Sequence, residues 1–146
     1  MVGSSRKAQD LAVQLLGFSR EDSHGREYLD TAVNDAFDRL RAQLSIRLGS
    51  AGYRALLVRA AALARTEHPW LATLQIDGEA NLHGFAEAVR SQDMSLAVDA
   101  GVLLIACLVG LLQTFIGEEL TRSILNDALP KPPHPDSAGS KENNNG

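Results

Sequence analysis

The sequence predicts an all-α protein: a bundle of four to five helices with a long apolar C-terminal helix and a disordered tail. Apolar residues recur at helical spacing through most of the first 129 residues. The five prolines occur only at position 69 and between positions 130 and 135, so the rest of the chain lacks the strongest helix breaker. Aromatic residues make up only 5% of the chain, so the core must consist mainly of Leu, Ala, Val and Ile. We expect one helical domain, residues 1–129, followed by a disordered Pro- and Asn-rich tail, residues 130–146.

Two helices are predicted in the first third of the chain. Ser4 or Ser5 can cap a first helix that ends near Leu16. A second helix is expected over residues 26–48, and it has the clearest amphipathic pattern in the sequence. Its apolar stripe repeats in steps of three and four residues and comprises Leu29, Val33, Ala36, Leu40, Leu44 and Leu48.

Glycine and proline divide the middle of the chain. Gly49 ends the second helix, and a third helix is expected over residues 51–67, because the residue before Pro69 disfavours the helical conformation. Residues 70–76 fit either a short extended piece or a helical turn. A short fourth helix is expected over residues 81–90.

The last predicted helix is unusually long. Asp93 or Ser95 can cap it, and it could continue to Leu129. That would make a rod of about 50 Å, at 1.5 Å per residue. We expect such a helix either to break near Gly101 or Gly110 or to extend into a partner subunit.

The run from Ala100 to Gly117 is uncharged and long enough for a helix to span a bilayer. Its flanks argue against a span, because Asp99, Glu118 and Glu119 bound it and no Lys or Arg lies next to either end. No Trp or Tyr stands at its edges to form an interfacial belt. We therefore interpret the run as the core helix of a bundle, with a transmembrane helix at residues 100–117 as the alternative.

A helix that is apolar on every face needs cover on every face. The other predicted helices are short, so we expect a second copy of the chain to supply part of the cover, as a homodimer. Small residues let helices approach closely, and they mark the expected helix-packing or dimer interface: Ala106, Gly110, Thr114 and Gly117. Residues 114–127, where the apolar run meets water, are a further place where a protein partner could bind.

Six arginines fall on the second and third predicted helices, with no acidic residue between the first and the last. They are Arg39, Arg41, Arg47, Arg54, Arg59 and Arg65. Such a cluster could bind an anionic partner. The net charge of −4 and the absence of interleaved aromatic residues argue against nucleic acid, and we interpret the arginines as pairing with acidic residues elsewhere in the chain.

No motif predicts a catalytic residue, a cofactor site or a metal site. Glu79, His83 and Glu87 recur at four-residue intervals, but a di-iron bundle needs a pair of Glu-x-x-His motifs on its helices, and these three residues do not supply one. Cys107 has apolar neighbours, which raise the pKa of a thiol and make it inert. An exposed His83 on a helix could accept a phosphoryl group, although the sequence around it carries no further feature of phosphotransfer modules.

These observations predict a non-enzymatic protein-interaction module that acts as a regulator, adaptor or scaffold. Its partners would be a second copy of itself and another protein. A lone cysteine and the absence of a signal peptide favour the cytoplasm. The alternatives are a small membrane protein that inserts residues 100–117, and a phosphotransfer module that uses His83.

Overall fold

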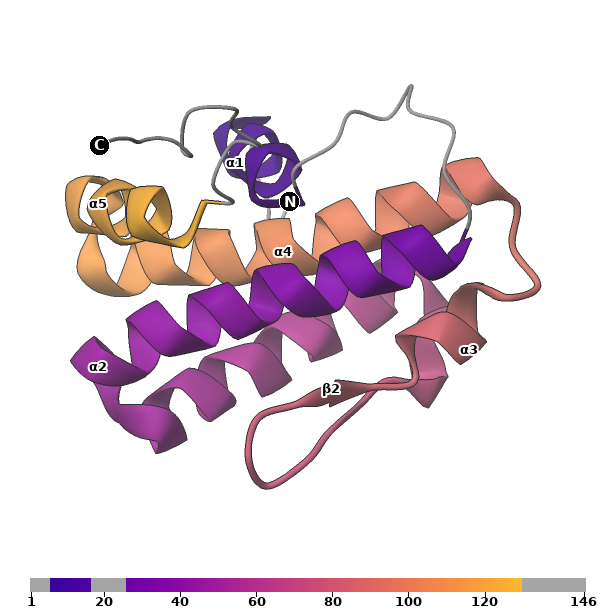
Figure 1. Cartoon of the computed structure of the whole chain (residues 1–146), viewed down its shortest axis with the longest axis horizontal. Coiled ribbons are helices and arrows are strands. Elements are labelled where there is room, and N and C mark those ends of the chain that lie inside the picture. The colour runs from indigo at the N-terminus through magenta and orange to yellow at the C-terminus, as the bar shows by residue number, and fades with distance from the viewer. Residues whose placement is uncertain (1–5, 17–25, 130–146) are drawn as a thin grey trace, which may run out of the picture.

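The computed structural model describes residues 6–16 and 26–129, which form a helical bundle (Figure 1). In chain order the elements are α1 (Arg6–Leu16), α2 (Arg26–Glu67), the 3-10 helix η1 (Pro69–Thr73), β1 (Gln75–Ile76), β2 (Leu82–His83), α3 (Phe85–Val89), α4 (Met94–Ile116) and α5 (Glu118–Ala128). The predicted all-α class is confirmed. The predicted caps Ser4 and Ser5 and the predicted disordered tail lie outside the described residues.

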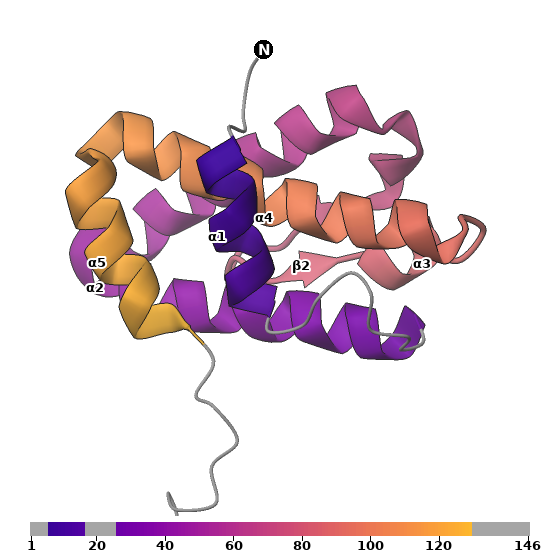
Figure 2. The same ribbon diagram turned by 90° about the horizontal axis from the view of Figure 1, so that it is seen from above.

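Helix α4 occupies the centre of the bundle. Figure 1 shows α1 and α5 on one side of it and the two halves of α2 on the other, and Figure 2 shows α1 crossing over α4. Twelve residues of α4, between Ala97 and Leu112, are buried. Within the described residues, α4 is the one helix long and apolar enough to cross a membrane, and 67% of its most apolar window is buried inside the protein.

The predicted second and third helices are joined in α2 across a bend. Gly49 has φ 79° and ψ 160°, a conformation that is essentially restricted to glycine, and the predicted break there is confirmed. Across the bend, the buried Tyr53 hydroxyl donates a hydrogen bond to the carbonyl of Phe37 at 3.2 Å. Burial raises the pKa of Tyr53, so this hydroxyl stays protonated and the two halves of α2 stay linked.

Helix α4 passes close to α2 at Gly101. A Cβ atom on this residue would lie 3.0 Å from Cγ2 of Val33 and 3.6 Å from side-chain atoms of Leu29 and Phe85. All three side chains are buried, and interiors are too closely packed to move aside at little cost. A side chain at this position would therefore crowd the crossing of the two helices, and glycine relieves that crowding.

The predicted break of the last helix near Gly101 or Gly110 is wrong. Asp93 caps α4 as predicted, its Oδ1 accepting a hydrogen bond from the amide of Leu96 at 3.0 Å, and the helix continues through both glycines. It ends at Gly117, which has φ 93° and ψ 161° and separates α4 from α5. Gly101, at the close helix crossing, keeps helical dihedral angles. Gly117 instead adopts dihedral angles that are open mainly to glycine, and the chain turns there.

The predicted helix over residues 81–90 is wrong in its first half. Leu82 and His83 form β2, which pairs antiparallel with β1, and only Phe85–Val89 are helical as α3. Gly84 lies between them with φ 91°, and a Cβ atom there would lie 2.4 Å from the carbonyl oxygen of Thr73. This close contact between two backbone segments docks α3 beside η1 and prevents an earlier start of the helix.

Candidate functional site

Arg39 binds the carboxyl-terminal ends of two helices. Its Nε donates to the carbonyl of Ala128 in α5 at 2.8 Å, and its Nη2 donates to the carbonyl of Leu15 in α1. The last carbonyls of a helix lack partners within the helix and carry a partial negative charge, which a guanidinium complements. Burial lowers the pKa of Arg39, and the charges of Asp35 and Asp38 act in the opposite direction. Arg39 thus holds α1 and α5 onto α2.

Two arginines in the second half of α2 hold the segment that leads from η1 into the hairpin. Arg54 donates from Nε to the carbonyl of Asp77 at 2.7 Å and from Nη2 to the carbonyl of Ile76 at 3.2 Å. Arg65 donates from Nη1 to the carbonyl of Leu74 at 3.2 Å. These guanidinium groups are therefore engaged by the backbone of the same chain.

The remaining three arginines of the predicted cluster differ from one another. Arg41 donates to the side-chain oxygen of Asn81 in the hairpin and pairs with Asp38 at 3.1 Å. Arg47 and Arg59 are exposed. Four of the six arginines thus join segments of this chain, through main-chain carbonyls and, for Arg41, mainly through side chains.

The hairpin turn is organised by the carboxylate of Asp77. Its Oδ1 accepts hydrogen bonds from the amides of Glu79 and Asn81 at 2.8 and 2.9 Å, and its Oδ2 lies 2.9 Å from Nε2 of His83. The hydrogen bond from the Asn81 amide, followed by that from His83, lowers the pKa of Asp77 well below its usual value. This arrangement holds Ala80 in the left-handed region, with φ 66°.

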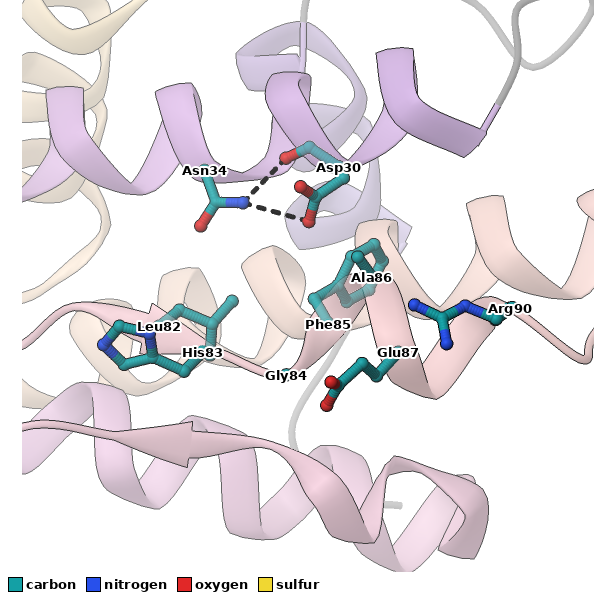
Figure 3. Close-up of a pocket in the computed structure, with 9 residues that line it drawn as sticks. All are labelled: Asp30, Asn34, Leu82, His83, Gly84, Phe85, Ala86, Glu87 and Arg90. Carbon is teal, nitrogen blue, oxygen red and sulfur yellow. Dashed lines mark hydrogen bonds between the residues drawn. The ribbon is translucent and has the colours of Figure 1, made fainter.

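A cleft of about 530 Å³ lies between α2 and the β2–α3 segment (Figure 3). Its polar lining comprises Asp30, Asn34, His83, Glu87 and Arg90. The side-chain amide of Asn34 donates to the carbonyl and to Oδ1 of Asp30, at 2.9 and 3.1 Å, and so fixes that carboxylate at the edge of the cleft. The cleft presents charges of both signs and is open to solvent, and it contains no arrangement of nucleophile and base.

Glu79, His83 and Glu87, which recur at four-residue intervals in the sequence, do not share a helical face. Glu79 lies in the hairpin turn, His83 in β2 and Glu87 in α3. Among the described residues, no three His, Cys, Asp or Glu side chains are placed to hold a metal ion together. The position of His83 in a strand also removes the helical premise on which the phosphotransfer alternative was based.

The lone thiol, that of Cys107, lies in the core. It is 2% exposed, and burial, with a smaller contribution from Glu67, raises the pKa of the thiol to about 11. Nucleophilic chemistry requires the thiolate, which is scarce at neutral pH when the pKa is this high. The predicted inertness of Cys107 therefore has a structural basis.

The two most exposed large apolar side chains of the described residues, those of Ile46 and Phe115, belong to segments at one end of the bundle, whereas Tyr28, 43% exposed, lies near the start of α2. Ile46, next to the bend of α2, is 80% exposed, and Phe115, next to the end of α4, is 67% exposed. Leu120, in the first turn of α5, is 42% exposed. Figures 1 and 2 show that the bend of α2 and the junction between α4 and α5 lie at the same end of the molecule. We call these three residues the apolar end.

The residues predicted as a helix-packing or dimer interface fall in two environments. Ala106 is fully buried within the chain and Gly110 is half-buried. Thr114 and Gly117 are exposed, and the Thr114 hydroxyl donates to the carbonyl of Gly110 at 3.1 Å. The structure therefore brings only the C-terminal part of the predicted interface to the surface, where it adjoins Phe115.

The sequence contained a signal for part of the apolar end. Ile46 lies outside the stripe formed by Leu40, Leu44 and Leu48, so the periodicity places it on the face of the helix that points away from the core. Phe115 gave no such signal, because it sits within a continuous apolar run in which buried and exposed residues look alike.

Comparisons of the chain with models of known protein families, with characterised proteins and with solved structures found no match.

Proposed function

We propose that this chain is a protein-interaction module that self-associates, and binds another protein, through the apolar end. The observation that carries the proposal is that the two most exposed large apolar side chains of the described residues, those of Ile46 and Phe115, stand close in the chain to the bend of α2 and to the α4–α5 junction, which lie at the same end of the bundle (Figure 1). Full burial of one large apolar side chain contributes about 1.5–3 kcal/mol. Clustered apolar side chains surrounded by polar ones are typical of protein-binding surfaces.

The flanking residues fit a protein partner. Arg47 is exposed beside Ile46, and Glu119 is exposed beside Leu120, so charges of both signs surround the apolar side chains. A polar rim of this kind is typical of interfaces between proteins. The proposal includes a regulatory, adaptor or scaffold role in the cytoplasm, a compartment in which a single buried thiol such as Cys107 is ordinary.

Light scattering on a sizing column, without detergent, tests the proposal. We expect a discrete dimer for the native chain and a monomer for the double variant Ile46→Ser and Phe115→Ser. Leu96→Ser is the matched control, because Leu96 is 37% exposed near the other end of α4. A monomer for the native chain at high concentration, or a dimer that survives the double substitution, would contradict self-association through this surface.

The membrane alternative is tested when the chain is expressed and fractionated before the light-scattering measurement. Helix α4 has the length and composition of a span, so recovery of the chain only in the membrane fraction would replace our proposal by insertion of residues 100–117. Incubation with acetyl phosphate, with His83→Gln as the control, tests the phosphotransfer alternative by the appearance of acid-labile phosphate.

A further inference from the structure

Two helical elements bend at a single glycine in the same way. Gly49 has φ 79° and ψ 160°, and Gly117 has φ 93° and ψ 161°. In the described part of the chain, no atom beyond the neighbouring stretch of the same backbone lies within 4 Å of the position that a Cβ atom would occupy at either glycine. The bends are therefore made by the backbone, and no side chain of another segment packs against either glycine at that position.

The two bends differ in what holds the chain on either side. Gly49 lies between two long packed halves of α2, which the hydrogen bond from Tyr53 to Phe37 links at 3.2 Å. Gly117 is followed by α5 alone, whose 11 residues are the last helix of the described chain. Opening at Gly117 would therefore displace one short helix, whereas opening at Gly49 would displace most of the fold.

Helix α5 is attached to the bundle by one apolar face. Its buried residues are Thr121, Ile124, Leu125 and Ala128, and it packs against α2, α4 and α1. The surface that receives this face, together with the hydrogen bond from Arg39 to the Ala128 carbonyl at 2.8 Å, is the α5 docking surface. The hydroxyl of Thr121 is buried there without a hydrogen-bond partner among the described residues, so the attachment is not optimal.

Helix-type hydrogen bonds are present on both sides of Gly117. Its amide donates to the carbonyl of Gln113 at 3.0 Å, and its carbonyl accepts from the amide of Thr121 at 3.2 Å. A change of φ and ψ at Gly117 to helical values would join α4 and α5 into one helix of about 35 residues and roughly 50 Å. That helix would carry the apolar face of α5 away from its own docking surface and leave both uncovered.

We propose that two copies of this chain exchange α5 by straightening at Gly117, so that each α5 occupies the docking surface of the other copy. The second copy fits because its docking surface is identical to the one that α5 has left, and exchange of an identical element is a low-cost route to a dimer. Phe115 and Leu120 flank Gly117 and are exposed when α5 lies on its own docking surface. In the exchanged dimer, the two straightened helices would cover these side chains at the point where the helices pass each other. This inference rests on the proposed self-association and specifies how it occurs.

Two variants of the junction test the exchange by light scattering, and they act in opposite directions. Gly117→Ala disfavours the bent conformation, because a residue with a Cβ atom is strained at these dihedral angles, and we expect the dimerisation constant to rise at least about tenfold. Insertion of Gly-Ser-Gly after Gly117 lets α5 reach its own docking surface without the bend, and we expect a monomer, with the 15.7 kDa of the native chain plus the three inserted residues. Gly78→Ala is the matched control, because it is also a glycine with no atom within 4 Å of its Cβ position, and we expect it to leave the mass unchanged.

The outcomes separate exchange from simple surface contact. If the insertion variant remains dimeric while Ile46→Ser with Phe115→Ser dissociates the dimer, exchange is refuted and the proposed function stands. If Gly117→Ala fails to fold, two other measurements still test the exchange. One is the mass of the insertion variant, and the other is the rate at which two differently tagged native dimers form mixed dimers. Exchanged dimers mix slowly, because α5 must leave its docking surface, and mixing within seconds would overturn the proposal.

Discussion

Replacement of Arg39 by methionine distinguishes a structural arginine from a partner-binding one. The substitution keeps a long apolar stem and removes the guanidinium that donates to the carbonyls of Leu15 and Ala128. A hydrogen bond from a charged donor contributes about 1.5–3 kcal/mol, and the half-buried position of Arg39 favours the lower part of that range. Loss of two such bonds should lower the free energy of unfolding by about 3 kcal/mol.

Chemical denaturation followed by circular dichroism measures this change, and thermal unfolding should show a midpoint about 10 °C lower. Arg39→Lys should recover less than half of the loss, because an ammonium group lacks the planar fork that reaches two acceptors. Arg47→Met is the matched control: Arg47 is exposed on the same helix, and its loss should change stability by less than about 0.5 kcal/mol. Equal effects of the Arg39 and Arg47 substitutions would refute this account of the arginines.

Three further predictions follow from the core and the hairpin. Gly101→Leu should lower the free energy of unfolding by at least about 2 kcal/mol in a denaturation experiment, because the leucine side chain would overlap Val33. A smaller loss would show that α2 and α4 can separate locally. The depressed pKa of Asp77 means that its stabilising contribution is present above pH 4 and lost as the pH falls further, so acid titration should destabilise the native chain more than Asp77→Asn. Cys107 should resist iodoacetamide at pH 8, where a thiol of pKa about 11 is about one part in a thousand thiolate, and rapid alkylation of the folded chain would contradict its burial.

The sequence was sufficient for the fold class and for the helices with clear ends. Periodicity and the cap at Asp93 placed most of the helical boundaries, since apolar spacing and local hydrogen bonding act within a few residues. The end of α4 was not predictable, because glycine is compatible both with a close helix crossing, as at Gly101, and with a bend, as at Gly117. Which role applies depends on the neighbouring element.

The candidate site was less predictable than the fold, for two physical reasons. The acceptors of Arg39, Arg54 and Arg65 are main-chain carbonyls, and every residue carries one, so no residue type in the sequence identifies them. Exposure of Phe115 depends on where the covering helices end, which is a property of the packed bundle rather than of the apolar run that contains it.

The arginine-to-carbonyl contacts also affect how the chain tolerates substitution. Arg54 and Arg65 bind main-chain oxygens of Ile76, Asp77 and Leu74, and those oxygens remain whatever side chain occupies the position. The path of residues 74–77 therefore stays anchored to α2 when an exposed side chain such as that of Gln75 is exchanged, whereas Asp77 must stay because its carboxylate organises the turn. A substitution that removes Arg54 or Arg65 would, by contrast, release the backbone of this segment whatever its side chains are.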